Sequence, residues 1–435
     1  KRRLTEFKIL LQKKKMSTIL QDTKLAAFRA DWKQTSLPVD ASVLAKANEV
    51  INTMDFPTTR TERWKYTRVT KIANKSFALG NEMTVSKLPD LPFDNAYNFV
   101  FVNGEFKAEL SGNAVDFQFE SIEKAAEARD FIGKAVDLDQ KVFAALNTAY
   151  ANGGAFIKIG AKQVIDKPVQ LIFISTGEQQ AANIRNVIVA DKFSQARISQ
   201  VFLSVDAKEC FSNVVTEYFL EDSASVVVDK IQNEDESVYQ VSLDYVKQPQ
   251  NSLFTLNTVT LNGALVRNNV YVDVAGQNAY THLNGAYVLK GGQHVDNHTT
   301  IDHLVANCES DEMYKGVIDE QATAVFNGKV FVRKDAQKIN AYQSNGNVLL
   351  SDSATVNSKP ELEIYADDVK CSHGSTTGQL DEEAIFYLRA RGISEKSAKA
   401  LMVTAFIGDV LDRIENKEII EYIHTILEER FGWTF

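Results

Sequence analysis

The strongest constraint on the fold is a long series of short β-strand patterns between about residue 154 and residue 370. Apolar segments such as AFIKIG, VQLIFIS, NNVYVDVAG and ELEIYADD follow one another, and none has the 3.6-residue period of an amphipathic helix. Polar corners separate the segments, as in VIVADKFSQA, YFLEDSASV and VLLSDSATV. The corners recur at irregular intervals, so the series is a degenerate repeat.

Two architectures accommodate many short strands joined by short polar corners: a β-sandwich and a solenoid of the parallel β-helix type. A sandwich usually closes within fewer residues than this series contains. A β-helix stacks each coil on the next and buries the inward apolar side chains in one long, narrow core. The length of the series therefore favours a mainly-β protein with a parallel β-helix core over residues 151–378.

Helical patterns precede this core, in an N-terminal domain that we expect to span residues 16–150. Leu25, Phe28 and Trp32 recur at three- and four-residue spacing, which predicts that they share one face of a helix. A second amphipathic run covers residues 41–54.

The later part of this domain changes character. Two alternating apolar runs within residues 97–110 flank Asn103 and Gly104, a pair that suits the type I′ turn of a β-hairpin. Residues 119–150 return to a helical pattern.

The first 15 residues, KRRLTEFKILLQKKK, differ from the rest in charge. They carry seven Lys or Arg and one Glu, a net +6, so the overall charge of −9 leaves −15 on the remainder. Met16 resembles a natural start, which favours an added extension over a basic arm for an anionic surface. Nucleic acid is not expected as a partner, because phosphate binding needs clustered Lys and Arg on the body of the protein.

The segment RTERWKYTRVTKI, residues 60–72, mixes basic and aromatic side chains. Such a mixture can stack on single-stranded nucleic acid. In an acidic protein, the favoured interpretation is that Trp64 and Tyr66 pack under the helices while the Arg and Lys heads stay in water.

Several classes of protein are disfavoured by what the sequence lacks. Three widely spaced cysteines cannot form a disulfide framework, which favours a reducing, cytoplasmic setting. No run of about 18 apolar residues predicts a membrane span, and no signal peptide is recognisable. The sequence contains no GxxxxGK[ST], GxGxxG, HExxH or GxSxG motif, so we expect no ATPase or dinucleotide site in this chain.

Residues 379–435 are expected to form a C-terminal helical domain. Asp381 and Ser394 are suitable N-caps for two helices, and a third covers KEIIEYIHTILEERF. The second helix has a broad apolar stripe, and the candidate partner-binding residues on it are Leu401, Phe406, Ile407 and Val410. The stripe is expected either to cap the end of the solenoid or to dock a partner protein, and both can hold.

One candidate metal site lies in GGQHVDNHTTIDH. His294, Asp296 and His298 would share one face of a strand, and two imidazoles with a carboxylate are a common ligand set for iron or zinc. His303 would fall on the other face, and a straight strand spreads alternate side chains about 7 Å apart. The competing interpretation is a structural ladder of hydrogen-bonded polar side chains.

The other candidate is Cys371-Ser372-His373. In an extended strand the cysteine and histidine side chains point the same way, and together they suit iron, zinc or copper. Two donors do not complete a site, so further donors would have to come from elsewhere, including another chain. A Cys–His nucleophile pair and a buried cysteine beside a turn-capping histidine are the alternatives.

The C-terminal run KCSHGSTTGQLDEEAIFYLRARGIS, continued by ALMVTAFIGDVLDRI, closely resembles the SufB/SufD family of the SUF iron–sulfur cluster assembly machinery. HVDNHTTIDH, ESDEMYKGV, GKVFVRKDAQKINAYQ and ERWKYT are also similar to this family. Two differences favour its SufD branch over its SufB branch. The chain reads VKCSHGST where SufB usually reads VEHEAST, and GNVLLSDS where SufB carries a QCDS element.

The resemblance implies a right-handed parallel β-helix between N- and C-terminal helical domains. It implies a non-catalytic scaffold that pairs with SufB, and whose C-terminal helices dock the ATPase SufC, which would be the only route by which ATP acts. Cys371 and His373 would lie at the SufB–SufD interface and hold iron or a nascent cluster transiently, with no tightly bound cofactor. The isolated chain could form a homodimer.

Two other functions stay open at this point. One is a structural β-helix adaptor in which Cys371 and His373 have no metal role. The other is a β-helix carbohydrate-active enzyme, which is disfavoured because no acidic cluster with exposed aromatic residues and no export signal is visible.

Overall fold

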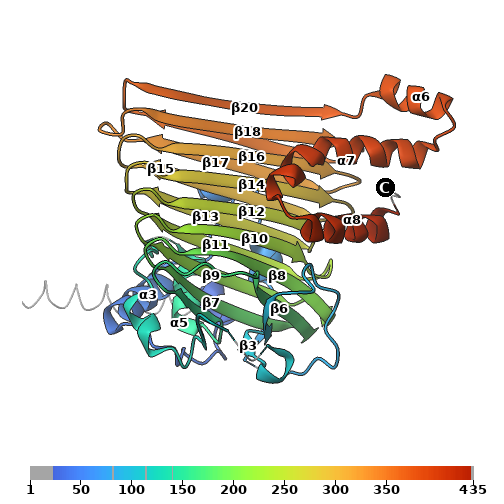
Figure 1. The fold of residues 1–435 in the computed structure, drawn as a ribbon. Coiled ribbons are helices and arrows are strands. Elements are labelled where there is room, and N and C mark those ends of the chain that lie inside the picture. The colour runs from blue at the N-terminus through green and yellow to red at the C-terminus, as the bar shows by residue number, and fades with distance from the viewer. Residues whose placement is uncertain (1–22, 81–82, 113–114, 140, 433–435) are drawn as a thin grey trace, which may run out of the picture.

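The computed structural model describes residues 23–80, 83–112, 115–139 and 141–432, so the 15-residue extension lies outside the described residues. Two ten-stranded sheets face each other along the molecule (Figure 1). From β5 onward, strands that follow each other in sequence alternate between the sheets, and almost every pairing within a sheet is parallel. This arrangement confirms the parallel β-helix, with helices at both ends of the chain.

The first sheet contains β1 (Ala78–Leu79), β4 (Gln118–Ser121), β5 (Ala155–Ile159), β7 (Gln180–Ala190), β9 (Phe211–Leu220), β11 (Tyr239–Gln248), β13 (Leu265–Val274), β15 (His294–His303), β17 (Thr323–Val332) and β19 (Thr355–Ile364). The second contains β2 (Tyr97–Val102), β3 (Glu105–Phe106), β6 (Val169–Glu178), β8 (Gln195–Lys208), β10 (Ser225–Asn233), β12 (Leu253–Asn262), β14 (Tyr280–Leu289), β16 (Glu309–Ile318), β18 (Ile339–Leu349) and β20 (Val369–Gln379). The described helices are α2 (Lys24–Phe28), α3 (Ala41–Thr53), α4 (Thr70–Ala73), α5 (Val142–Tyr150), α6 (Glu382–Ala390), α7 (Glu395–Ile414) and α8 (Lys417–Phe431), with 3-10 turns at Glu62–Trp64, Ala108–Leu110 and Ala126–Asp130.

The irregular repeat has a structural origin in the coils. Residues paired between successive coils lie 26 residues apart between β11 and β13 but 32 apart between β17 and β19. Three of the corners nevertheless share a conformation, because Phe193, Ser223 and Glu320 all have a positive φ, between 51° and 62°. At these three corners a left-handed residue turns the chain sharply into the next strand.

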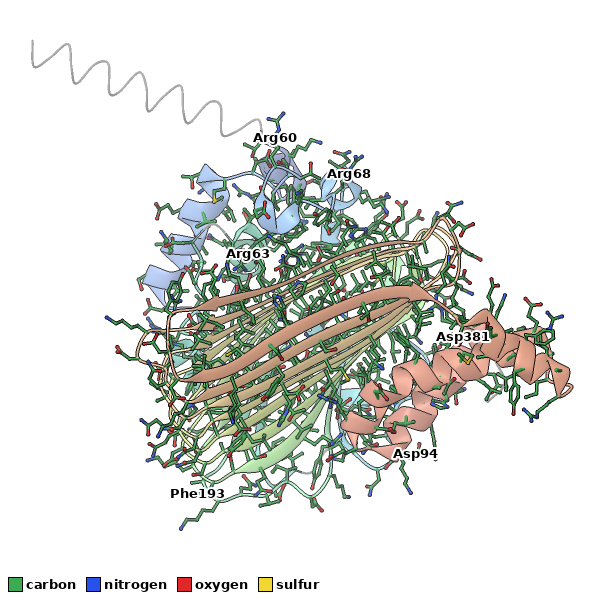
Figure 2. All side chains as sticks on the ribbon, turned by 90° about the horizontal axis from the view of Figure 1, so that it is seen from above. Arg60, Arg63, Arg68, Asp94, Phe193 and Asp381 are labelled. Carbon is green, nitrogen blue, oxygen red and sulfur yellow. The ribbon has the colours of Figure 1, made fainter. Side chains whose placement is uncertain are left out.

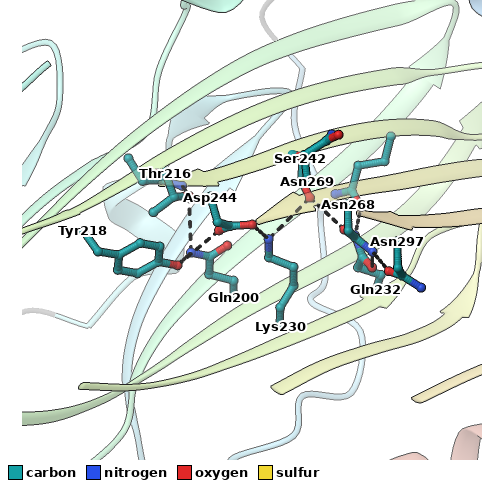
Figure 3. Close-up of polar contacts among 12 residues, drawn as sticks. Gln200, Thr216, Tyr218, Lys230, Gln232, Ser242, Asp244, Asn268, Asn269 and Asn297 are labelled. Atoms are coloured by element: carbon teal, nitrogen blue, oxygen red, sulfur yellow. Dashed lines mark hydrogen bonds and ion pairs between the residues drawn. The ribbon is translucent and has the colours of Figure 1, made fainter. Parts of the chain in front are cut away.

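The interior of the β-helix is apolar over most of its length but contains buried polar side chains. Figure 3 shows such a group, in which Lys230 forms an ion pair with Asp244 and both side chains are only 1% exposed. Tyr218 donates to Asp244 Oδ1 at 3.4 Å, and Gln200 Nε2 donates to the Tyr218 hydroxyl at 2.7 Å. These bonds satisfy groups that would be costly to bury alone.

The N-terminal region differs from the expected helical domain in one part. The hairpin at Asn103 and Gly104 is confirmed, as β2 pairs antiparallel with the short β3. The prediction of helix over residues 119–150 is wrong in its first half, because β4 joins the first sheet and only α5 is an α-helix there. Strand β2 also extends the second sheet, so the sheets continue into residues before 150.

The N-terminal helices cover the outer face of the first sheet. Leu25, Phe28 and Trp32 are all buried, although α2 ends at Phe28 and Trp32 lies beyond it. They belong to a cluster that includes Phe211 on β9 and Val241 on β11. The expected burial of these three side chains is therefore confirmed, but α2 is shorter than the helix that their spacing predicted.

The C-terminal helices lie on the outer face of the second sheet (Figure 1). Apolar residues of α7 and α8 pack on Ile231, Val259, Val288 and Val317, which belong to β10, β12, β14 and β16. The helices thus cover the flank of the solenoid, and the expectation that they cap its end is wrong. N-caps at Asp381 and Ser394 are confirmed by their side-chain hydrogen bonds to the first turns.

Candidate functional site at the open end of the β-helix

The β-helix ends in a coil that no described element covers. Most residues of β20 are exposed, whereas most residues of the preceding strand of the same sheet, β18, are buried. Viewed from above, β20 lies uppermost and leads at Asp381 into helices that project to one side (Figure 2). Inner side chains of the last coil and the free edge of β20 are therefore accessible.

Cys371 and His373 both belong to β20, where they pair with Ala341 and Gln343 of β18. Val369 and Cys371 pack against the main core, so this set of alternate residues faces the inside of the coil, and His373 continues it. His373 is exposed at the uncovered end. The structure thus places both side chains on the inner side of the last coil.

The environment of Cys371 is unlike that of a catalytic nucleophile. Burial raises the pKa of its thiol, although a hydrogen bond from the backbone of Ala341 opposes this effect. Nucleophilic cysteines have a lowered pKa, because the thiolate is the reactive form. A metal ion can still displace the thiol proton when it binds.

The described residues alone do not complete a metal site. No group of three or more His, Cys, Asp or Glu side chains in this part of the chain is arranged to hold a metal ion. Cys371 and His373 therefore offer two donors, and any further donor would come from another molecule or from solvent.

His294, Asp296 and His298 project from β15 toward the N-terminal region and are held by protein partners. Asp296 forms a buried ion pair with Arg267, accepts a hydrogen bond from Thr67, and lies 2.9 Å from His298 Nε2. His294 Nε2 is 2.9 Å from the Thr67 hydroxyl. A structural ladder of hydrogen-bonded polar side chains accounts for these contacts, and it joins the N-terminal region to the sheet.

The pKa values of the ladder residues are shifted by burial and by the neighbouring Arg267 guanidinium. Burial alone would raise the pKa of Asp296, but Arg267 and His298 bring it below its usual value. Burial lowers the pKa of both His294 and His298, which favours their neutral forms. His303, on the opposite face of the strand as expected, is buried and lies 3.0 Å from the Ser310 hydroxyl.

The ERWKYT segment packs beside this ladder. Trp64 stacks on Phe143 with ring centroids 5.3 Å apart, and the Arg267 guanidinium lies 3.8 Å from the Trp64 centroid. Trp64 thus packs as predicted, but Tyr66 is 41% exposed and does not. A cavity of about 720 Å³ adjoins Trp64, and its lining includes Tyr271, whose ring carries a Lys141 ammonium at 4.3 Å. The rings of Trp64 and Tyr271 are therefore already in contact with cations of this chain, Arg267 and Lys141.

The four candidate partner-binding residues on α7 do not share one exposed face. Ile407 and Val410 are each 1% exposed, and Ile407 belongs to the cluster on the second sheet. Phe406 is partly buried, with the Lys315 ammonium 4.7 Å from its ring centroid, and Leu401 is 42% exposed. Ile407 and Val410 are thus corrected from partner contacts to intramolecular packing, because both side chains are buried within the chain.

Two exposed aromatic residues on α6 were not predicted from the sequence. Phe386 is 73% exposed and Tyr387 is 58% exposed, whereas Ile385 and Leu388 are partly buried. The available signal was a pair of large aromatic side chains on the side of the helix away from its apolar stripe.

Family models match nearly the whole of this architecture. The model described as the SUF system FeS cluster assembly, SufBD core domain, matches residues 173–406. The SufBD protein N-terminal region matches residues 25–171. The chain belongs to the SufBD family.

Curated relatives agree with this membership. An iron–sulfur cluster assembly SufBD family protein of Synechocystis sp. is 30% identical over 391 residues, which cover 85% of this chain and 86% of the relative. The SufD proteins of Escherichia coli and Bacillus subtilis are 26% and 23% identical, and each alignment covers 86% of this chain and 89% of the relative. Like these relatives, this SufBD-family chain is assigned to iron–sulfur cluster assembly.

No helix in the described part of this SufBD-family chain is long and apolar enough to cross a membrane. The expectation of a cytoplasmic location stays a prediction.

Proposed function

We propose that this chain is a non-catalytic scaffold subunit that pairs end to end with a SufB-type subunit and holds iron or a nascent cluster between the two proteins. The observation that carries the proposal is the uncovered last coil, with Cys371 and His373 on its inner side. Cys371 and His373 provide two neighbouring donors beside the open end of the β-helix, which is half of a metal site. A partner bound at that end would supply the remaining donors.

The free edge of β20 supports the same mode of assembly. An edge strand presents unpaired N–H and C=O groups, which another chain can pair with by adding a strand. Without the partner, two copies of this chain are expected to pair through the same edge.

Iron and the cluster are cargo in this proposal. His373 supplies a nitrogen donor, and Cys371 supplies sulfur after it loses its proton to solvent. Because burial raises the pKa of the Cys371 thiol, its share of the site is expected to form only with the metal in place. ATP enters only through a SufC-type ATPase.

Anaerobic reconstitution with SufB-type and SufC-type partners tests this role. We expect His373→Ala to lower the cluster yield at least tenfold, measured by visible absorption, because the site loses one of its two donors from this chain. His282→Ala is the matched control, since His282 lies on β14 and outside the last coil. Wild-type yield from a folded, fully assembled His373→Ala complex would refute the role of His373.

The exposed face of α6 is the proposed contact for the ATPase. Phe386 and Tyr387 are large, exposed aromatic residues, a type that is enriched in protein interfaces. The buried residues of α7 would instead hold the helices on the solenoid, so that a pull on α6 is transmitted to the second sheet.

We expect the double variant Phe386→Ala, Tyr387→Ala to bind the SufC-type ATPase at least tenfold more weakly in a titration by biolayer interferometry. Phe193→Ala is the control, because Phe193 is 53% exposed at a corner remote from α6 (Figure 2). Equal loss of affinity in both variants, or in neither, would contradict a docking role for α6. Removing residues 381–435 is a poorer test, since it would also uncover the second sheet.

A further inference from the structure

A column of polar side chains lies beneath His373 inside the β-helix. In the parallel register His373 of β20 pairs with Gln343 of β18, and Gln343 pairs with Glu312 of β16. Residues paired in parallel strands point to the same side, and adjacent strands lie about 4.8 Å apart. His373 is therefore the outermost member of a column whose next two members are Gln343 and Glu312.

The two inner members of the column are buried and bonded to each other. Glu312 is 1% exposed and Gln343 is 3% exposed. Gln343 Nε2 donates to Glu312 Oε2 at 2.6 Å. Burial raises the pKa of Glu312 to about 7, although the hydrogen bond from Gln343 opposes that rise.

Packing also fixes the position of the Gln343 amide. Gly328 of β17 lies against it, and a Cβ at residue 328 would come within 2.3 Å of Gln343 Nε2. An alanine at that position would displace the amide. The absence of a side chain at Gly328 thus makes room for the Gln343 amide next to Glu312.

The hydrogen bond to Glu312 determines which end of the Gln343 amide remains available for another hydrogen bond. The carboxylate of Glu312 can only accept when ionised, so it pairs with the amide nitrogen and leaves the oxygen for another donor. Gln343 Oε1 has no hydrogen-bond partner among the described residues. An unpaired buried carbonyl destabilises the fold, so a donor at the next position of the column would be favoured.

We propose that Gln343 is a positioning residue for His373: its Oε1 accepts the N–H of one imidazole nitrogen, and Glu312 holds the amide in the orientation that presents this oxygen. The other ring nitrogen then carries the lone pair and is turned toward the open end. Metal-binding histidines commonly have their second nitrogen held by such an acceptor, which fixes the tautomer. This inference rests on the proposed role of His373 as a donor.

The tautomer of His373 can be measured without any metal. We would label the histidines of the full chain with ¹⁵N and ¹³C and record their ring signals by NMR at about pH 8, well above an ordinary imidazole pKa of about 6.5. The chain has six histidines, and the His373 signal is the one lost in His373→Ala. The expected wild-type result is one tautomer in roughly tenfold excess, which corresponds to about 1.4 kcal/mol.

The variants test each member of the column. Gln343→Met keeps a side chain of similar length without the amide oxygen, and Glu312→Gln keeps the shape but no longer fixes the amide; both should bring the ratio of tautomers within about threefold of unity. Glu234→Gln is the matched control, because Glu234 is a second buried glutamate with a pKa of about 7, bonded to Ser175 in a distant coil. It should leave the ratio unchanged.

Three results would overturn the inference: a mixed population in the wild type, an unchanged ratio in Glu312→Gln, or the same change in Glu234→Gln. If Gln343→Met does not fold, the nearly isosteric Glu312→Gln decides. The outcome is independent of cluster yield, so a fixed tautomer combined with normal clusters from His373→Ala would refute the donor role and leave the positioning intact.

Discussion

Replacing Asp296 with alanine is expected to lower the free energy of unfolding by about 3–5 kcal/mol, because it leaves the Arg267 guanidinium buried without its carboxylate. Both side chains of this ion pair are 1% exposed, so water cannot replace the lost partner. Thr67 also loses its acceptor, and the contact between the N-terminal region and β15 is weakened. Urea denaturation followed by circular dichroism measures the change.

The control for this variant lies on the same strand. Asp302 pairs with Arg333, whose side chain is 47% exposed, so Asp302→Ala should cost no more than about 1 kcal/mol. A chelator should not change the melting temperature of the wild type, because the ladder is held by protein contacts. If Asp296→Ala proves no more harmful than Asp302→Ala, or if chelation lowers the melting temperature, the structural role of the ladder is wrong.

Truncating Ile407 to alanine is expected to cost about 2–4 kcal/mol, because the side chain is fully packed between α7 and the second sheet. Leu401→Ala, on the same helix, should change the free energy of unfolding by no more than about 0.5 kcal/mol, since Leu401 is 42% exposed. Hydrogen exchange of the α7 amides measures both effects locally.

The comparison of Ile407 with Leu401 separates two roles for one apolar stripe. If both variants left the protection of α7 unchanged, the helix would not be held by the sheet and its apolar residues would be free for a partner. If both weakened it equally, the exposed fraction of Leu401 would not describe its environment in solution.

The architecture of the core was predictable because β-strand patterns and corners are local properties. Alternating apolar residues over 4–8 positions identify a strand, and a polar corner identifies its end. Asn103 with Gly104, Asp381 and Ser394 were also correctly placed, since a turn or a helix cap depends on only a few neighbouring residues. The prediction of helix over residues 119–150 is wrong in its first half, because β4 is stabilised by pairing with β5, which lies outside that segment.

For the site at Cys371 and His373, only the types of donor side chain could be predicted from the sequence. Alternation places Cys371 and His373 on the same side of a strand, but it does not say whether that side faces the core, solvent or a partner. The paired residues of adjacent coils lie 30 positions apart in the sequence, as Gln343 and His373 do. No pattern within β20 therefore indicates the amide beneath the histidine.

By itself, the sequence determined that successive short strands would form coils, where the helices would be capped, and which family the chain resembles. Only the tertiary structure decided that Asp296 pairs with Arg267, that Ile407 faces the second sheet, and that the last coil stays open at Cys371 and His373. The physical reason is the range of the interactions. Strand periodicity and capping act within a few residues, whereas burial and ion pairing depend on which distant side chains the coils bring into contact.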